Sequence, residues 1–522
     1  MPHLLDANGR ARRTLLVSGA TALAAWASRA PALAVRDVAG PDPFALGVAS
    51  GDPWASSVVL WTRLAPTPLA EDGFGGMPAR DVAVRWEVAT DDTFTRVVRR
   101  GQVTARAADA HAVHVEVGGL APGRTYHFRF TAMGHQSRPG RTRTAPAPGQ
   151  ATSARFGVAS CSRYETGHFT AYRHLAEERP DLVLHLGDYI YEYAGNPKTP
   201  VVRPFEQGEI VTLADYRLRY ARYRLDPDLQ ALHATAPFAV VFDDHEVDNN
   251  WAGDVPEDAQ TREQFLARRT AAFRAYHEVM PLRQAARPDG SRLRLYRDLA
   301  WGDLATLYML DTRQYRDDQP CGDGNRVDCA EAALPGRTML GAAQEGWLRT
   351  RAHASVARWD VLGQQVFFGE LVRPLPDGRD AAPMDSWNGY VAARARVLDT
   401  FTARQRNLVV LTGDIHRHYA ATLHAGATGP DRPAVGAEFV TTSVTSGGDG
   451  TDDPASVDPI LSRNPAIAYT CDRRGYLVAD VTRDTWTTHY RVVPWVTRPG
   501  APVETRRSYV VEAGRPGLTL AG

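Results

Sequence analysis

Short runs in which apolar and polar residues alternate dominate the chain from about residue 44 to residue 146. In residues 82–88, for example, every second position is valine or tryptophan. A β-strand with one buried face has this period of two. Glycine and proline separate the runs, as in the turn over residues 118–123. Short strands at regular spacing favour a β-sandwich over residues 35–146. The strands that we expect are 57–62, 82–88, 113–117 and 126–130.

The expected sandwich has an immunoglobulin or fibronectin character. Residues 119–126 resemble the strand-turn-strand corner of fibronectin type III-like domains. The block contains no cluster of catalytic residue types, so we expect it to support or position the rest of the chain. A linker rich in Ala, Pro, Gly and Thr follows over residues 142–153.

After the linker, continuous apolar runs alternate with helical stretches. Residues 171–179 have apolar side chains on one face of a helix, and residues 261–280 form a longer amphipathic helix. The alternation predicts a layered α/β domain over residues 147–522, which includes a C-terminal tail after residue 493. The strands that we expect are 154–161, 180–188, 237–245, 304–311, 359–368 and 407–416.

Four of these apolar strands end in residues that bind metals. The strand ends carry Cys161, Asp188, Asp244-His245 and Asp414-x-His416. In layered α/β sheets, ligands bind at the carboxyl ends of the strands, so these four ends can converge on one site. Gly187 allows a sharp turn before Asp188, whose two carboxylate oxygens can bridge two cations. The sequence therefore predicts a metal centre.

The acidic segment over residues 242–251 supports a cation. It places seven polar residues of ligand type within nine positions after an apolar strand. Burying such a cluster without a cation would cost several kcal/mol for each uncompensated charge. The alternative interpretation is an acidic loop exposed to water.

The N-terminus has the order of parts of an export signal. A twin arginine, Arg12-Arg13, precedes an apolar run over residues 15–27 and the small-x-small sequence Ala32-Leu33-Ala34. Residues 1–34 are therefore expected to direct the protein to the twin-arginine export machinery, and thus to the periplasm or the exterior. A chance Arg-Arg before an N-terminal helix is the alternative.

Composition excludes several function classes. The formal net charge of +0 gives no reason to expect nucleic-acid binding. No segment after the signal is long enough to span a membrane, so an integral membrane protein is not expected. Lys198 is the one lysine, and the Gly-Lys-Ser/Thr loop of P-loop nucleotide hydrolases is absent. We expect a monomer.

The cysteines divide into two kinds. Cys321 and Cys329 lie eight residues apart in a polar loop, which in an exported protein predicts a local disulfide. Cys161 ends a strand, as described above. Cys471 has no evident partner and is expected to be a partly buried free thiol.

Taken together, the motifs resemble those of PhoD-type alkaline phosphatases in the calcineurin-like metallophosphoesterase superfamily. The resemblance covers nearly all of the mature chain. It implies a four-layer α/β/β/α catalytic domain preceded by the β-sandwich, and a secreted enzyme that hydrolyses phosphate mono- and diesters with a metal-activated hydroxide. The residues that carry the resemblance are 160–162, 187–193, 243–250, 311–316, 386–390 and 412–416.

The resemblance also implies metal ligands. Thiolate and phenolate ligands suit Fe³⁺, which we expect at a site formed by Cys161, Asp188, Tyr191 and His416. Carboxylates suit one or two Ca²⁺ ions. Asp188 would bridge to the calcium site, and its other expected ligands are Asp244, Asp414 and Asn250. Asp243 in place of Asp244, and Asn249 in place of Asn250, remain open alternatives.

The expected catalytic residues are Asp188, His245 and Arg313. Asp188 holds the ions that activate water, and His245 contacts the phosphate or protonates the leaving group. Arg313 either offsets charge on the phosphoryl oxygens or serves as a structural ion-pair partner. Three other interpretations stay open: Cys161 as a nucleophile, a phospholipase D-like diesterase of the same fold, and an exported binding protein with structural metals.

Overall fold

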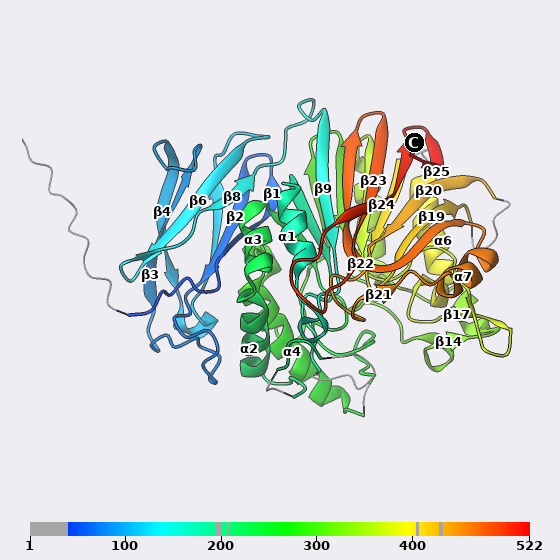
Figure 1. Ribbon diagram of the computed structural model, residues 1–522, viewed down its shortest axis with the longest axis horizontal. Coiled ribbons are helices and arrows are strands. Elements are labelled where there is room, and N and C mark those ends of the chain that lie inside the picture. The colour runs from blue at the N-terminus through cyan, green and yellow to red at the C-terminus, as the bar shows by residue number, and fades with distance from the viewer. Residues whose placement is uncertain are drawn as a thin grey trace, which may run out of the picture. The chain divides into compact units, whose positions relative to one another are not determined.

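The computed structural model describes residues 40–193, 201–205, 208–257, 259–402, 407–426 and 432–521, and Figure 1 shows its elements. The expected export signal over residues 1–34 and Lys198 lie outside the described residues. In the ranges given above, no helix has the length and apolar character needed to cross a membrane.

The N-terminal part is a β-sandwich, as its alternating pattern predicts. One layer contains β4, β3, β6 and β7 in that order, with β8 also paired to β6. The other layer contains β1, β2 and β5. Val84 and Phe128 of the first layer share one buried cluster with Leu60 of the second. The strands are β1 (Val48–Trp54), β2 (Ser57–Arg63), β3 (Val82–Ala89), β4 (Val97–Ala105), β5 (Ala112–Gly118), β6 (Thr125–Ala132), β7 (His135–Gln136) and β8 (Gly140–Arg143).

A first sheet of the layered α/β part is built on three parallel strands, β9, β10 and β11. The long strand β22 pairs antiparallel with β9, and β23, β24 and β25 continue the sheet. The segment that the sequence predicts to be a tail therefore consists largely of sheet strands. The bounds are β9 (Ser153–Ala159), β10 (Leu182–Leu186), β11 (Phe238–Val241), β22 (Ile467–Thr482), β23 (Thr485–Val493), β24 (Glu504–Glu512) and β25 (Arg515–Leu520).

A second sheet has the order β12-β13-β15-β18-β20-β19. The first residues of β22 pair with β19, so this strand belongs to both sheets. Short strands form peripheral pairs. The bounds are β12 (Arg297–Trp301), β13 (Ala305–Met309), β14 (Asn325–Arg326), β15 (Trp359–Gln364), β16 (Arg373–Pro374), β17 (Asp380–Pro383), β18 (Asn407–Thr412), β19 (His418–His424), β20 (Ala434–Val440) and β21 (Gly450–Thr451).

Helices cover the outer faces of the two sheets. Leu175 of α1 and Phe273 of α4 belong to the apolar core that contains β9 to β11. Leu348 of α5 and Val397 of α6 instead pack with Val410 of β18. The order helix, sheet, sheet, helix confirms the four-layer α/β/β/α architecture. The helices are α1 (Thr170–Glu177), α2 (Leu213–Arg224), α3 (Pro227–Thr235), α4 (Arg262–Val279), α5 (Gly341–Ala354), α6 (Val391–Thr402) and α7 (Asp458–Arg463).

Helices α2 and α3 add to the set expected from the sequence, although both carry start signals. Thr212 forms a capping box with Asp215 at the beginning of α2. Asp226 accepts hydrogen bonds from the first turn of α3, where Pro227 takes the first position. Both helices lie in the segment between β10 and β11.

The sandwich and the first α/β sheet share a strand pairing. Gly51 of β1 lies opposite Phe238 of β11 in a parallel bridge. Figure 1 shows β1 and α3 next to each other at this junction, and the two elements are in contact. The boundary predicted at residue 146 falls between β8 and β9.

A side chain at Gly51 should weaken this junction. A Cβ atom there would press on the backbone carbonyl oxygens of Pro281 and Phe238, the latter 2.9 Å away. Backbone atoms cannot move aside cheaply, so we expect Gly51→Ala to cost about 2 kcal/mol, as overpacking typically does. The measurement is the melting temperature. Gly118→Ala is the matched control, because a Cβ atom at Gly118 meets nothing within 4 Å. Equal melting temperatures for the two variants would contradict the prediction.

Candidate metal centre

Four strands place the candidate metal ligands in the same way. Cys161, Asp188, Asp243 and Asp414 are each the second residue after the end of β9, β10, β11 or β18. Cys161, Asp188 and Asp414 have φ values of 59°, 53° and 63°. This left-handed conformation turns the chain sharply after the strand. His416, with φ 57°, repeats it two residues after Asp414.

Glycine lets two strand ends approach each other closely. Gly187 has φ +101°, and a Cβ atom there would lie 2.7 Å from the backbone nitrogen of Asp243. Any larger residue would push Asp188 and Asp243 apart. Gly187 is therefore needed both for the turn before Asp188 and for the close approach of the two strand ends.

The first group of side chains is the one expected to bind iron. Single ligand atoms of Cys161, Asp188 and His416 lie within 4.8 Å of one another. The hydroxyl of Tyr191 donates to Asp188 Oδ2 at 2.8 Å and lies 2.9 Å from His416 Nε2. Ser446 Oγ donates to the same tyrosine oxygen at 2.7 Å. The hydroxyl of Tyr191 thus contacts two of the three grouped side chains.

Two further groups lie on the other side of Asp188. One comprises Asp188, Asp244 and His245, and the other comprises Asp243, Asp244 and Asp414, each within the same 4.8 Å limit. Asp188 therefore belongs to the first and second groups, as a bridging carboxylate would. Asp244 belongs to two groups and Asp243 to one, which favours Asp244 between these open alternatives.

Burial shifts the pKa values of the side chains in this cluster. Desolvation, reinforced by the neighbouring acids, raises the pKa of the Cys161 thiol and of the Asp188 carboxyl well above their usual values. Desolvation and Asp188 likewise raise the pKa of Tyr191. Burial lowers the pKa of His416 to about 3, so its imidazole is neutral and can donate a lone pair to a metal.

Several carboxylate oxygens of the cluster accept no hydrogen bond. Among the described residues, Asp188 Oδ1, Asp243 Oδ2 and Asp244 Oδ1 are buried and lack a hydrogen-bond donor. Unpaired buried carboxylate oxygens are costly, and a cation is the usual compensation. The donor set of thiol, phenol, imidazole and carboxylates therefore fits metal ions.

Arg313 is the main positive charge inside the cluster. It is completely buried. Its Nε donates to Asp243 Oδ1 at 2.5 Å and its Nη1 to Asp385 Oδ1 at 2.9 Å. Its Nη2 lies 3.4 Å from Asp244 Oδ1 and 3.5 Å from Asp414 Oδ1. These contacts favour the structural ion-pair role over direct contact with substrate.

His245 is oriented by a carboxylate. Its Nδ1 lies 2.7 Å from Glu192 Oε2, while Glu192 Oε1 accepts the backbone N–H of Asn249 at 2.9 Å. Burial opposes the charged form, but Glu192, Asp244 and Asp188 together raise the pKa of His245 well above its usual value. The imidazole is thus held as a cation with Nε2 as its remaining donor.

Comparison with known protein families identifies phosphatases as relatives of this chain. The PhoD-like phosphatase model matches residues 156–490, and the model of the N-terminal domain of PhoD-like phosphatases matches residues 28–146. The chain belongs to the PhoD-like phosphatase family. Membership makes this protein a phosphoric ester hydrolase.

Individual relatives agree with this family assignment. Alkaline phosphatase D of Bacillus subtilis (strain 168) is 49% identical over 485 residues, which cover 91% of this chain and 82% of the relative. A solved structure of PhoD has a TM-score of 0.89 and 48% identity, covering 92% of each chain. Purple acid phosphatase PPD1 from yellow lupin (Lupinus luteus) seeds has a TM-score of 0.55 at 12% identity, covering 89% of this chain and 73% of the other. The lupin structure shows likeness of fold alone.

The interpretation of Cys161 as a nucleophile finds little support in this PhoD-like phosphatase. Its Sγ contacts Ser160 Oγ at 3.2 Å. The raised pKa described above keeps the thiol protonated until a cation binds, and protonated thiols are poor nucleophiles. Cys471 is a buried free thiol on β22.

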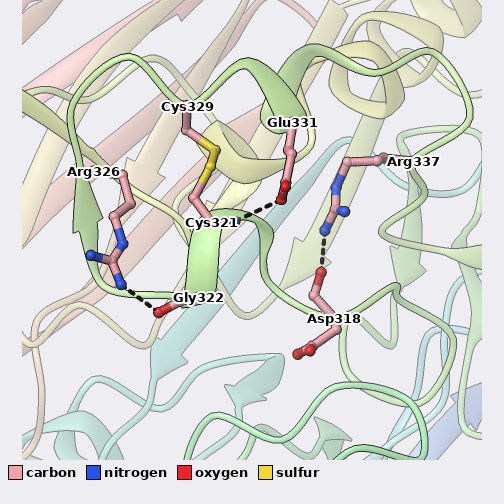
Figure 2. The surroundings of a disulfide bond; sticks show 7 residues. All are labelled: Asp318, Cys321, Gly322, Arg326, Cys329, Glu331 and Arg337. Carbon is pink, nitrogen blue, oxygen red and sulfur yellow. Dashed lines mark hydrogen bonds between the residues drawn. A yellow bond between two sulfur atoms is a disulfide. The ribbon is translucent and has the colours of Figure 1, made fainter.

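A disulfide between Cys321 and Cys329 closes a short loop (Figure 2). The Cα atoms of the two cysteines are 6.2 Å apart, which confirms the expected local bridge. Glu331 accepts the backbone N–H of Cys321 at 2.8 Å. Asp323, inside the loop, accepts a hydrogen bond from Asn250 Nδ2 at 2.8 Å. Asn250 is therefore held through its amide nitrogen, which leaves its amide oxygen available.

Sequence reasoning did not identify several residues that support the ligands. The buried Glu246 accepts the backbone N–H groups of Asp188 at 3.0 Å, Tyr189 at 2.5 Å and Asp243 at 2.7 Å. The carboxylate of Glu246 thereby ties the ends of β10 and β11 together. Its place in the acidic segment was a signal, but ligand and supporting carboxylates look alike in sequence. Asp385, Glu192 and Ser446 are supporting residues of the same kind.

Glu246→Gln should weaken metal binding more than folding. A glutamine amide would turn one N–H₂ group toward backbone donors, and support of this kind is typically worth 10- to 100-fold in metal affinity. The measurement is metal content after dialysis against graded chelator. Glu438→Gln is the matched control, because Glu438 is also buried and accepts the backbone N–H groups of Phe368 and Gly369, each at 2.8 Å. Equal metal retention by both variants would refute a special role for Glu246.

Proposed function

We propose that this PhoD-like phosphatase hydrolyses phosphate mono- and diesters at a metal centre built around Asp188. The observation that carries the proposal is that a ligand atom of Asp188 lies within 4.8 Å of Cys161 and His416 and, within the same limit, of Asp244, which is itself grouped with Asp414. A shared carboxylate holds two ions at the short separation that suits in-line displacement at phosphorus. The name of the Bacillus subtilis relative, alkaline phosphatase D, supports the same reaction.

The two sides of Asp188 suit different ions. Cys161, Tyr191 and His416 offer sulfur, phenolic oxygen and nitrogen, which suit Fe³⁺. Asp244 and Asp414, with the amide oxygen of Asn250, offer hard oxygen ligands that suit one or two Ca²⁺ ions. The proposed content is one iron and one or two calcium ions.

The side chains of the protein take the remaining roles in the reaction. When bound, the ions supply Lewis-acid activation of a water molecule and positive charge toward the phosphoryl oxygens. His245, held by Glu192, donates a proton from Nε2 to the leaving oxygen. Arg313 balances the charge of Asp243 and Asp385 and keeps the carboxylates of the second side in place. Asp188, whose backbone N–H donates to the Glu246 carboxylate, would hold the ions together with the other candidate ligands.

We also propose that the protein is exported as a folded monomer. The twin arginine and the cleavage-type sequence near residue 34 support export by the twin-arginine machinery. The Cys321–Cys329 disulfide is consistent with an oxidising compartment.

Metal removal tests the proposal directly. Treatment with EDTA should lower kcat/KM for p-nitrophenyl phosphate and its bis-ester by at least about 100-fold, because water activation and charge stabilisation are both lost. Added Ca²⁺ should restore activity, whereas Zn²⁺ should not. EDTA saturated with Ca²⁺ beforehand is the control for effects of the chelator itself. Full activity in protein shown to be free of metal would disprove the metal-dependent reaction.

Tyr191→Phe should remove a visible absorption band. A phenolate bound to Fe³⁺ gives a charge-transfer band that a phenyl ring cannot give, while Cys161, Asp188 and His416 remain to hold iron. The measurements are the visible spectrum and the iron content. Tyr189→Phe is the control, because the hydroxyl of Tyr189 contacts His233 at 3.0 Å and not the metal centre. An unchanged band in the Tyr191 variant would exclude this tyrosine as a ligand.

A further inference from the structure

A pocket of about 440 Å³ opens beside the metal centre. His416, a proposed iron ligand, forms part of its wall, and Arg417 follows it directly in the chain. The rest of the wall comes from β16, β19, β22 and the region around α7. Its apolar members are Pro374, Ile415, Tyr419, Pro459 and Ile460. The pocket thus has an apolar body next to the place where phosphate chemistry is proposed.

Three arginines and one aspartate charge the pocket wall. Arg474 has a structural role: its Nη2 donates to Asp472 Oδ1 at 2.6 Å and its Nη1 to the His416 carbonyl at 2.9 Å. This ion pair cancels one positive and one negative charge. The excess positive charge of the pocket therefore resides on Arg373 and Arg417.

Neither of these two guanidinium groups has a carboxylate partner among the described residues. Arg417 Nη2 donates to Ser456 Oγ at 2.9 Å, and its Nε is buried without a hydrogen-bond acceptor. A buried donor without an acceptor costs free energy that an anionic ligand would recover. Guanidinium groups pair well with carboxylates and phosphates because their planar donors match both.

We infer that the pocket formed by Arg373, Arg417 and their apolar neighbours, here called the arginine pocket, binds a second anionic group on the leaving-group part of the substrate. This inference rests on the proposed function, since it places the scissile phosphoryl group at the neighbouring metal centre. The preferred substrates are then phosphate esters whose alcohol part carries an apolar spacer and a carboxylate or a further phosphate.

The test compares two aryl esters of the same shape and different charge. The probes are 4-carboxyphenyl phosphate and 4-carbamoylphenyl phosphate, and the readout is the ratio of their kcat/KM values within one enzyme preparation. Incomplete metal loading affects both values equally and leaves the ratio unchanged. In the Arg373→Gln/Arg417→Gln double variant we expect the ratio to fall about 10-fold relative to the wild type, as the loss of two partly exposed charge pairs predicts.

Controls separate the pocket from bulk charge. Arg515→Gln also removes one positive charge, from a side chain that is 81% exposed and does not line the pocket, and should keep the wild-type ratio. About 0.5 M NaCl should lower the wild-type ratio by screening. A third probe, 1,4-phenylene bisphosphate, shows whether phosphate or carboxylate is the better second anion. A double variant with the wild-type ratio would overturn the inference.

Binding of inert analogues distinguishes this inference from the proposed function. Calorimetry would compare 4-carboxybenzylphosphonate with 4-carbamoylbenzylphosphonate. If the wild type hydrolyses neither ester but binds the carboxylate analogue more tightly, and the double variant loses that preference, the pocket stands and the hydrolytic proposal fails. Equal binding of the two phosphonates by the wild type would reject the arginine pocket, whether or not the esters are hydrolysed.

Discussion

The structure depends on negative charge buried at one point, the carboxylate of Asp188. This side chain is 1% exposed and belongs to two groups of potential ligands. Arg313 contacts the aspartates on one side but makes no ion pair with Asp188 among the described residues. A buried carboxylate with an unpaired oxygen takes up a proton unless a cation is paired with it, and the raised pKa of Asp188 reflects this. The candidate ligands grouped around Asp188 therefore fit a site that is completed by metal.

Several residues of the site have energetically unfavourable backbone conformations. Cys161, Asp188, Asp414 and His416 all adopt left-handed conformations, each of which costs roughly 1–2 kcal/mol for a residue with a side chain. Such strain persists where surrounding contacts determine it fully. Glu246 fixes the backbone at Asp188, and Arg474 holds the carbonyl of His416 from β22. Strand β22 thereby stabilises a proposed ligand more than fifty residues earlier in the chain.

The predictable and unpredictable parts of this molecule differ in the range of the interactions that form them. The strands that end in Cys161, Asp188 and Asp414 were predictable because an apolar run followed by a polar ligand is a local signal. The roles of Glu246 and Ser446 were not, because each depends on which backbone group lies opposite after folding. The strands β24 and β25 were not predicted for the same reason. They are peripheral and mixed in polarity, and they are defined by the pairing of β24 with β23 and of β25 with β24.

The two sides of the centre also differ in how metal binding couples to protons. On the side proposed to bind iron, burial raises the pKa of both Cys161 and Tyr191, so an ion that takes thiolate and phenolate ligands must displace two protons. Binding there becomes more favourable as the pH rises. His416 is already neutral and releases none. A highly charged ion best offsets the free-energy cost of removing these two protons, because it attracts the resulting thiolate and phenolate most strongly. The carboxylate side suits an ion of lower charge. The asymmetry of the ligands around one shared carboxylate therefore favours two different metals over two copies of one.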